Sequence, residues 1–176
     1  MYFEKTIKSE NIFEGKIIKV KRDTVELINN KTSTRELILH PGGVAVVAMD
    51  DNDNVYMVRQ FRKPFEKELL EIPAGKLEYN EDHRKAGLRE LKEETGLKCR
   101  EFIYMGYYMS SPGFLNEIIH LYIAKGLTKE EQNLDEDEFL NVEIYHKDEI
   151  LKMIKNNEIT DGKSVTALLK AFNNLY

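Results

Sequence analysis

Residues 75–97 read GKLEYNEDHRKAGLRELKEETGL and contain three closely spaced glutamates, Glu90, Glu93 and Glu94. A helix turns about 100° per residue, so Glu90 and Glu94 would lie on one stripe of a helix with Glu93 beside them. Like charges at this spacing repel each other and destabilise an isolated helix, so the pattern requires a compensating cation. Because the charged groups are carboxylates with no cysteine among them, magnesium or manganese fits the pattern better than zinc.

The composition is typical of a soluble globular protein, with 41% hydrophobic and 32% charged residues. A chain of 176 residues is long enough for one domain with a sizeable core. The net charge of -5 argues against a general nucleic-acid-binding protein, although a metal and a few local arginines could still bind an anionic substrate. Cys99 is the single cysteine, which excludes an intramolecular disulfide and argues against a cysteine-based zinc site within one chain.

The sequence carries no signal for membrane insertion. No apolar run approaches the roughly 20 residues that a membrane-spanning helix needs, and the N-terminal MYFEKTIKSE lacks the apolar core of a signal peptide. We therefore expect a cytoplasmic protein that does not bind membranes.

Hydrophobic patterning predicts a chain that begins with strands and ends with helices. Residues 44–49 are almost continuously apolar, as in a strand buried on both faces, and residues 55–61 are the expected hairpin partner. The acidic helix is expected to begin near Asn80, a good N-cap, and to end at Gly96, which can adopt the left-handed conformation. The other expected elements are strands at 12–20, 24–27, 33–39, 69–72, 103–108, 118–124 and 140–145, a turn at Asn29-Asn30, and helices at 148–155 and 163–173.

The residue spacing in the acidic segment matches a known pattern. Gly75, Glu81, Arg89-Glu90-Leu91, Glu93-Glu94 and Gly96-Leu97 together resemble the Nudix box at every fixed position. The resemblance implies an α/β Nudix fold, in which a mixed β-sheet is sandwiched between helices, with a strand-rich N-terminal extension at residues 1–40 and the hydrolase domain at 41–176. It also implies hydrolysis of a nucleoside diphosphate linked to another group.

The flanking segments resemble one branch of that family, the ADP-ribose pyrophosphatases. Pro112 lies fifteen residues beyond Leu97, within Ser111-Pro112-Gly113-Phe114, as in that branch. The branch resemblance implies cleavage of ADP-ribose to AMP and ribose 5-phosphate. Further segments similar to the branch are Phe13-Glu14-Gly15-Lys16, Arg35-Glu36, His40-Pro41-Gly42, Arg59-Gln60-Phe61-Arg62, Glu71-Ile72-Pro73-Ala74-Gly75 and Ile159-Thr160-Asp161-Gly162-Lys163-Ser164.

The resemblance also implies a metal site. Glu90 and Glu94 would be direct ligands, with the Ala74 carbonyl completing the site and Glu93 acting as a ligand or as a nearby base. Arg89 lies four residues before Glu93, so we expect it to orient Glu93 rather than to contact substrate. The alternative reading of the three glutamates is a solvated helix face.

An attacking water needs a base, and the glutamates of the box are largely occupied by metal. In the branch resembled here, a loop after the box supplies further carboxylates, and residues 134–139 are the downstream acidic run placed suitably. We expect Glu136 to be the general base and Glu138 to be an additional metal ligand, with the two roles open to exchange. The alternative is an acidic surface loop.

Five further residues are expected to contact substrate. Phe13 offers a ring for stacking on adenine, and Arg35 and Arg62 offer guanidinium groups that can donate to phosphate or stack. Glu36 and Glu117 can accept hydrogen bonds from the base or ribose hydroxyls. Each of them could instead be a packing or surface residue. The four histidines are scattered without zinc-site spacing, and we expect them to be structural or exposed: His40, His83, His120 and His146.

The branch resemblance implies a homodimer whose N-terminal strands bring Phe13, Arg35 and Glu36 to the site of the partner chain. The expected partner molecule is a nucleoside diphosphate substrate, and nucleic acid is not expected to bind. One rival hypothesis keeps the chemistry and changes the substrate to another ADP-sugar, a nucleotide sugar or a dinucleotide. The other is a nucleotide sensor without catalysis, which would not need the complete set of carboxylates.

Overall fold

The computed structural model describes residues 2–78, 80–134 and 139–176 and divides into two compact units. The first unit contains Met1–Gly42 and Met109–Ile118, and the second contains Gly43–Tyr108 and Ile119–Tyr176. The Nudix-box segment lies in the second unit.

The first unit is built on an antiparallel three-stranded sheet of β1 (Lys5–Glu14), β2 (Lys19–Glu26) and β3 (Thr32–Leu39). The single strand expected at 12–20 is wrong, because the chain turns after Glu14 and the Gly15 N–H donates to the Ile18 carbonyl at 2.9 Å. The turn expected at Asn29-Asn30 is confirmed. Asn30 has a φ of 61°, a conformation that asparagine tolerates better than most residues.

The second unit contains the expected mixed sheet. Its strands follow the order β12 (Leu140–His146), β5 (Asn54–Arg62), β4 (Gly43–Met49), β10 (Ile118–Lys125) and β9 (Glu101–Met109). β4 is parallel to β10 and antiparallel to β5, which confirms the hairpin expected between β4 and β5. Two shorter strands extend the sheet, β6 (Lys67–Glu71) beside β5 and β7 (Ala74–Lys76) beside β4. The remaining small elements are η1 (Lys63–Phe65), β8 (Leu97–Lys98) and β11 (Thr128–Lys129).

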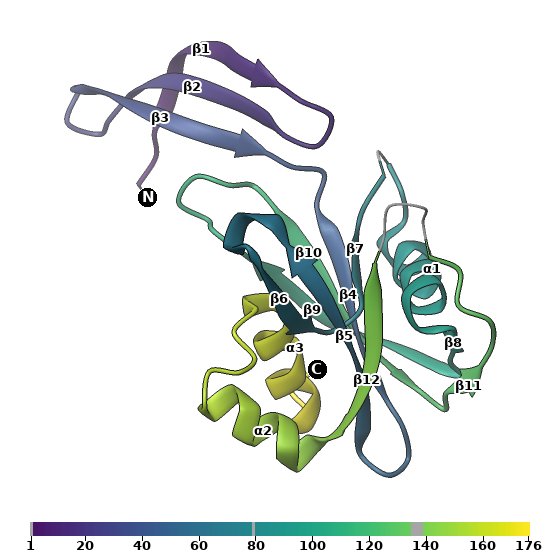
Figure 1. Cartoon of the computed structure of the whole chain (residues 1–176). Helices are drawn as coiled ribbons and strands as arrows, with labels where there is room; N and C mark the ends of the chain where they lie inside the picture. The colour runs from purple at the N-terminus through teal and green to yellow at the C-terminus, as the bar shows by residue number, and fades with distance from the viewer. Residues whose placement is uncertain (1, 79, 135–138) are drawn as a thin grey trace. The chain divides into compact units, whose positions relative to one another are not determined.

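Helices cover both faces of this sheet (Figure 1). On one side α1 (His83–Thr95) packs through Ala86 and Leu91 against Val44, Val46 and Ala48 of β4. On the other side α2 (Lys147–Lys155) and α3 (Gly162–Phe172) enclose the alternate β4 residues in a second core. Strand β4 is therefore buried on both faces, as its continuous apolar sequence predicts.

Helix α1 begins later than predicted and ends at the predicted residue. Its N-cap is Asp82, whose side chain accepts the Lys85 N–H at 2.9 Å, while Asn80 lies in the preceding turn with a φ of 64°. Gly96 ends the helix with a φ of 66°, and its N–H donates to the Lys92 carbonyl at 2.8 Å. Both Asn80 and Asp82 are good N-cap residues, so composition alone did not distinguish them.

Two of the scattered histidines meet in the fold. The rings of His83 on α1 and His120 on β10 stack with centroids 3.8 Å apart, and the Tyr122 hydroxyl lies 2.6 Å from His83 Nδ1. Burial and the nearby charge of His83 lower the pKa of His120. This contact joins the first turn of α1 to the sheet, so these two histidines are packing residues.

Among the described residues, no helix combines the length and apolar character needed to cross a membrane.

Candidate active site

Two carboxylates of α1 are buried against the loop that precedes the helix. Glu90 and Glu94 are 7% and 2% exposed. The Glu94 carboxylate accepts the Ala74 N–H at 2.9 Å, and the Glu90 carboxylate lies so close to Gly75 that a Cβ there would be 1.8 Å from Glu90 Oε1. Glycine at position 75 therefore provides the space for the Glu90 carboxylate, and Ala74, Glu90 and Glu94 are brought together as expected.

Arg89 is the cation among these acidic side chains. Its Nη1 lies 2.8 Å from the Glu93 carboxylate and 2.9 Å from that of Glu90, and its Nε lies 3.3 Å from Glu81. Burial lowers the pKa of Arg89, but the charge of Glu90 and the hydrogen bonds to Glu81 and Glu93 outweigh this effect, so the pKa is raised. The contact with Glu93 is compatible with the expected orienting role, which stays a prediction.

Glu81 holds the loop before α1 against the helix. Its carboxylate accepts the Glu78 N–H at 2.9 Å and faces Arg89. Burial raises the pKa of Glu81, but the hydrogen bonds from Glu78 and Arg89 outweigh it and the pKa is lowered. Glu81 is therefore ionised at neutral pH and orients the arginine.

The donor set fits a divalent cation. Carboxylate oxygens and a main-chain carbonyl are the hard ligands that magnesium and manganese prefer. Arg89 contacts Glu90 and Glu93, and the charge of Arg62 acts on Glu94. Buried carboxylates need such compensation, and a bound cation would add to it. Among the residues that the structure describes, no group of three or more histidine, cysteine or acidic side chains is already arranged around one point.

Arg62 also belongs to this neighbourhood, because the charge of Glu94 acts on it. Its Nε and Nη2 donate to the two oxygens of Glu71, each at 2.8 Å, and Glu71 is 1% exposed. The sequence suggested Arg62 as a phosphate donor but assigned no role to Glu71. The one sequence signal for Glu71 was its position in the segment Glu71-Ile72-Pro73-Ala74-Gly75, which is similar to the ADP-ribose pyrophosphatase branch.

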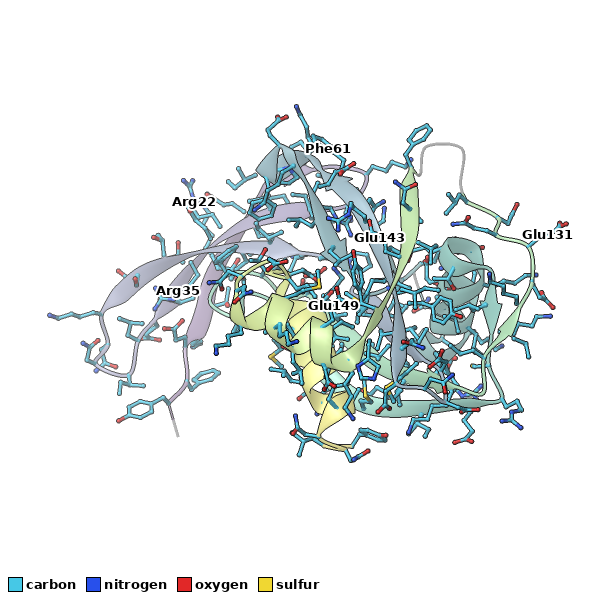
Figure 2. The ribbon with its side chains drawn as sticks, turned by 60° about the horizontal axis from the view of Figure 1, so that its bottom comes forward. Arg22, Arg35, Phe61, Glu131, Glu143 and Glu149 are labelled. Carbon is cyan, nitrogen blue, oxygen red and sulfur yellow. The ribbon has the colours of Figure 1, made fainter. Side chains whose placement is uncertain are left out.

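The other expected substrate residues lie in the first unit. Arg35 pairs with Glu4, with Nε 2.9 Å from the carboxylate, and projects from β3 as Arg22 does from β2 (Figure 2). Phe13 is 54% exposed, and Glu36 lines a pocket of about 360 Å³ together with Phe114.

Glu117, also in the first unit, accepts the Ser110 hydroxyl at 2.7 Å and lies 3.3 Å from His40 Nδ1. Glu136 and Glu138, the expected base and additional ligand, lie outside the described residues.

Comparison with known proteins agrees with this geometry. A model of the NUDIX domain matches residues 39–168, and one of the nucleoside diphosphate sugar hydrolase N-terminal domain matches residues 4–38. The chain belongs to the Nudix family. The expected family and the expected Nudix fold are thus confirmed.

Two relatives align with the Nudix chain over almost its full length. The "Methanol dehydrogenase activator" of Bacillus methanolicus is 51% identical over 96% of this chain and 92% of its own. The "ADP-ribose pyrophosphatase" of Bacillus subtilis (strain 168) is 44% identical over 94% of this chain and 90% of its own. A crystal structure of an ADP compounds hydrolase shares the fold with a TM-score of 0.87 at 20% identity, covering 98% of this chain and 94% of the other.

We expect Gly75→Ala to weaken the metal site without unfolding the protein. The added methyl would displace the Glu90 carboxylate, while the backbone at position 75 can accommodate alanine. The magnesium concentration for half-maximal activity should rise roughly 10- to 100-fold, as when a group that supports a metal ligand is lost. Metal titration of activity, with melting temperature measured in parallel, tests this.

Gly113→Ala is the matched control, because a Cβ there meets no atom within 4 Å. Its metal titration should match the wild-type curve. An unchanged magnesium requirement in Gly75→Ala would contradict the assigned contact between Gly75 and Glu90.

Proposed function

We propose that this Nudix protein hydrolyses the pyrophosphate bond of ADP-ribose, giving AMP and ribose 5-phosphate, with magnesium or manganese as cofactor. The observation that carries the proposal is the burial of Glu90 and Glu94 against Ala74 and Gly75 in a complete Nudix box. The 44% identity to an ADP-ribose pyrophosphatase over nearly the whole chain supports the substrate. The proposal includes a cytoplasmic location.

The metal would be held by the carboxylates of Glu90, Glu93, Glu94 and Glu138 and by the Ala74 carbonyl. When bound, it neutralises pyrophosphate charge and lowers the pKa of a coordinated water. Arg89 holds Glu93 in a fixed orientation through the 2.8 Å contact.

The proton of the attacking water passes to Glu136. The water oxygen forms a bond to phosphorus while the bond from that phosphorus to the bridging oxygen breaks.

Five residues are proposed to contact the substrate. Arg62 donates to the pyrophosphate oxygens, Phe13 stacks on adenine, and Arg35 binds phosphate. Glu36 and Glu117 accept hydrogen bonds from the base or ribose. In the proposed homodimer, Phe13, Arg35 and Glu36 act at the partner's site.

A second candidate function comes from the relative with 51% identity, which is named an activator of methanol dehydrogenase. A Nudix chain could stimulate a dehydrogenase, with or without hydrolysis of a nucleotide. A nucleotide sensor is a third possibility, but the complete set of box carboxylates favours catalysis. Hydrolysis of another ADP-sugar or of a dinucleotide keeps the same chemistry.

Product analysis tests the proposal. Purified protein is incubated with magnesium and, separately, ADP-ribose, ADP-glucose, NADH and a diadenosine polyphosphate. AMP and ribose 5-phosphate should form fastest from ADP-ribose. Faster cleavage of another compound would overturn the substrate, and stimulation of a methanol dehydrogenase without any cleavage would favour the activator function.

Glu94→Gln should lower turnover by more than about 100-fold, because a direct ligand should matter more than the outer-shell partners that are worth 10–100-fold. The fold should persist, since glutamine can still accept the Ala74 N–H. Steady-state kinetics and circular dichroism measure the two effects. Glu149→Gln on α2 removes an exposed carboxylate (Figure 2) and should retain wild-type turnover. Near-normal turnover of Glu94→Gln would refute its metal role.

Glu136→Gln should lower turnover by roughly 10²- to 10⁴-fold, the usual contribution of a general base, with metal affinity largely unchanged. Manganese binding followed by electron paramagnetic resonance gives the affinity independently of turnover. If Glu138→Gln alone abolishes turnover while Glu136→Gln remains active, the base is assigned to the wrong glutamate.

A further inference from the structure

Glu71 is a buried carboxylate held by two cations from distant parts of the chain. Arg62 on β5 contacts both of its oxygens at 2.8 Å, and Lys163 in the first turn of α3 contacts Oε2. The Lys163 side chain is 12% exposed and that of Glu71 is 2% exposed. Nothing in the proposed reaction uses Lys163 or Glu71 directly.

The first turn of α3 is tied to the same segment of the chain. Asp161 caps the helix by accepting the Ser164 N–H at 3.0 Å, and it also accepts Lys163 Nζ at 2.9 Å. The Ser164 hydroxyl, which is fully buried, donates to Asp161 and accepts the Ile72 N–H at 2.9 Å. This turn therefore supports residues 71 and 72, just before the Ala74 carbonyl.

Charge balance keeps this group ionised. Burial raises the pKa of Glu71, but the hydrogen bond from Arg62 and the charge of Lys163 outweigh it, so the pKa is lowered. Arg62 and Lys163 compensate the negative charges of Glu71 and Asp161. Removing one member of such a buried group leaves its partner poorly compensated. Lys163 thus adds a second cationic contact at Glu71 Oε2, the oxygen that also accepts from Arg62 Nη2, and further limits the freedom of the carboxylate.

We propose that Lys163 is a positioning residue for substrate binding: it fixes Glu71, and Glu71 fixes the guanidinium of Arg62. A guanidinium carries five N–H donors, and the bonds through Nε and Nη2 use one edge. The three remaining donors, two on Nη1 and one on Nη2, can bind two phosphate oxygens. The Arg62 side chain is 37% exposed, so part of it reaches solvent. This role of Lys163 rests on the proposed function.

Loss of Lys163 should affect KM for the substrate and not kcat. Arg62 contacts the substrate anion rather than the reacting water, so loss of its orientation raises KM and leaves the chemical step in place. Lys163→Met should raise KM for ADP-ribose by about tenfold or more, with kcat within about threefold of wild type. Lys163→Arg keeps a cation that can reach both carboxylates, and its KM should stay within about threefold of the wild-type value.

A double-mutant cycle distinguishes positioning from a general structural role. If Lys163 acts through Arg62, then Lys163→Met should have no further effect on KM in an Arg62→Ala background. Independent, multiplicative effects of the two substitutions would overturn the proposal. Binding of the ADP-ribose analogue with a methylene bridge in the pyrophosphate, measured by calorimetry, should show the same coupling without turnover.

Glu143→Gln is the matched control for loss of an ion pair on β5. Arg59, three residues before Arg62, contacts Glu143 of β12 through Nε at 2.5 Å and Nη2 at 3.0 Å. Loss of this ion pair in Glu143→Gln should lower the melting temperature but leave KM for ADP-ribose unchanged. A rise in KM equal to that of Lys163→Met would show that any lost ion pair on β5 has this effect, and would overturn the proposal.

Failure of the proposed function and failure of the role of Lys163 give different results. If the wild-type protein neither cleaves ADP-ribose nor binds its methylene analogue, the proposed function fails and the role of Lys163 fails with it. If the wild-type protein cleaves ADP-ribose and Lys163→Met leaves KM unchanged, only the role of Lys163 fails.

Discussion

The close contact between the carboxylates of α1 and the backbone at Ala74 and Gly75 is the constraint on which the rest of the site depends. Glu94 accepts the Ala74 N–H, and Glu90 occupies the space that a side chain at position 75 would fill. Both carboxylates are almost fully buried, which costs free energy unless hydrogen bonds and cations compensate them. The fold therefore brings acidic side chains together although their charges repel each other. Sites that bind divalent metals need such a cluster of carboxylates.

Several elements of the second unit hold these carboxylates and the backbone at Ala74 and Gly75 in place. Strand β7 carries Ala74 and Gly75 and pairs with β4, which is buried between the two helical layers. Arg89 and Glu81 secure the loop before α1, while the first turn of α3 reaches Ile72 and Glu71 from the other helical layer. Rigid elements thus fix the carboxylates from several directions, which favours precise geometry.

Sequence patterns predicted the elements whose signals are local. The apolar run of β4 and the glycine that ends α1 needed no knowledge of distant residues, and the box spacing identified the carboxylates. The break after Glu14 was missed because apolar and β-branched residues flank a single glycine there. The pairing of distant side chains could not be predicted either. Glu71 and Lys163 are 92 residues apart, and their contact depends on how α3 packs against the sheet. The roles assigned to Phe13, Arg35, Glu36 and Glu117 stay predictions.

The central claim is that a divalent metal binds between Glu90, Glu94 and the Ala74 carbonyl. The most direct measurement is an anomalous difference map from a crystal grown with manganese and the methylene analogue of ADP-ribose. We predict a manganese peak in contact with both carboxylates and with the Ala74 carbonyl oxygen, beside the pyrophosphate. Manganese bound elsewhere, in contact with neither Glu90 nor Glu94, would contradict the account.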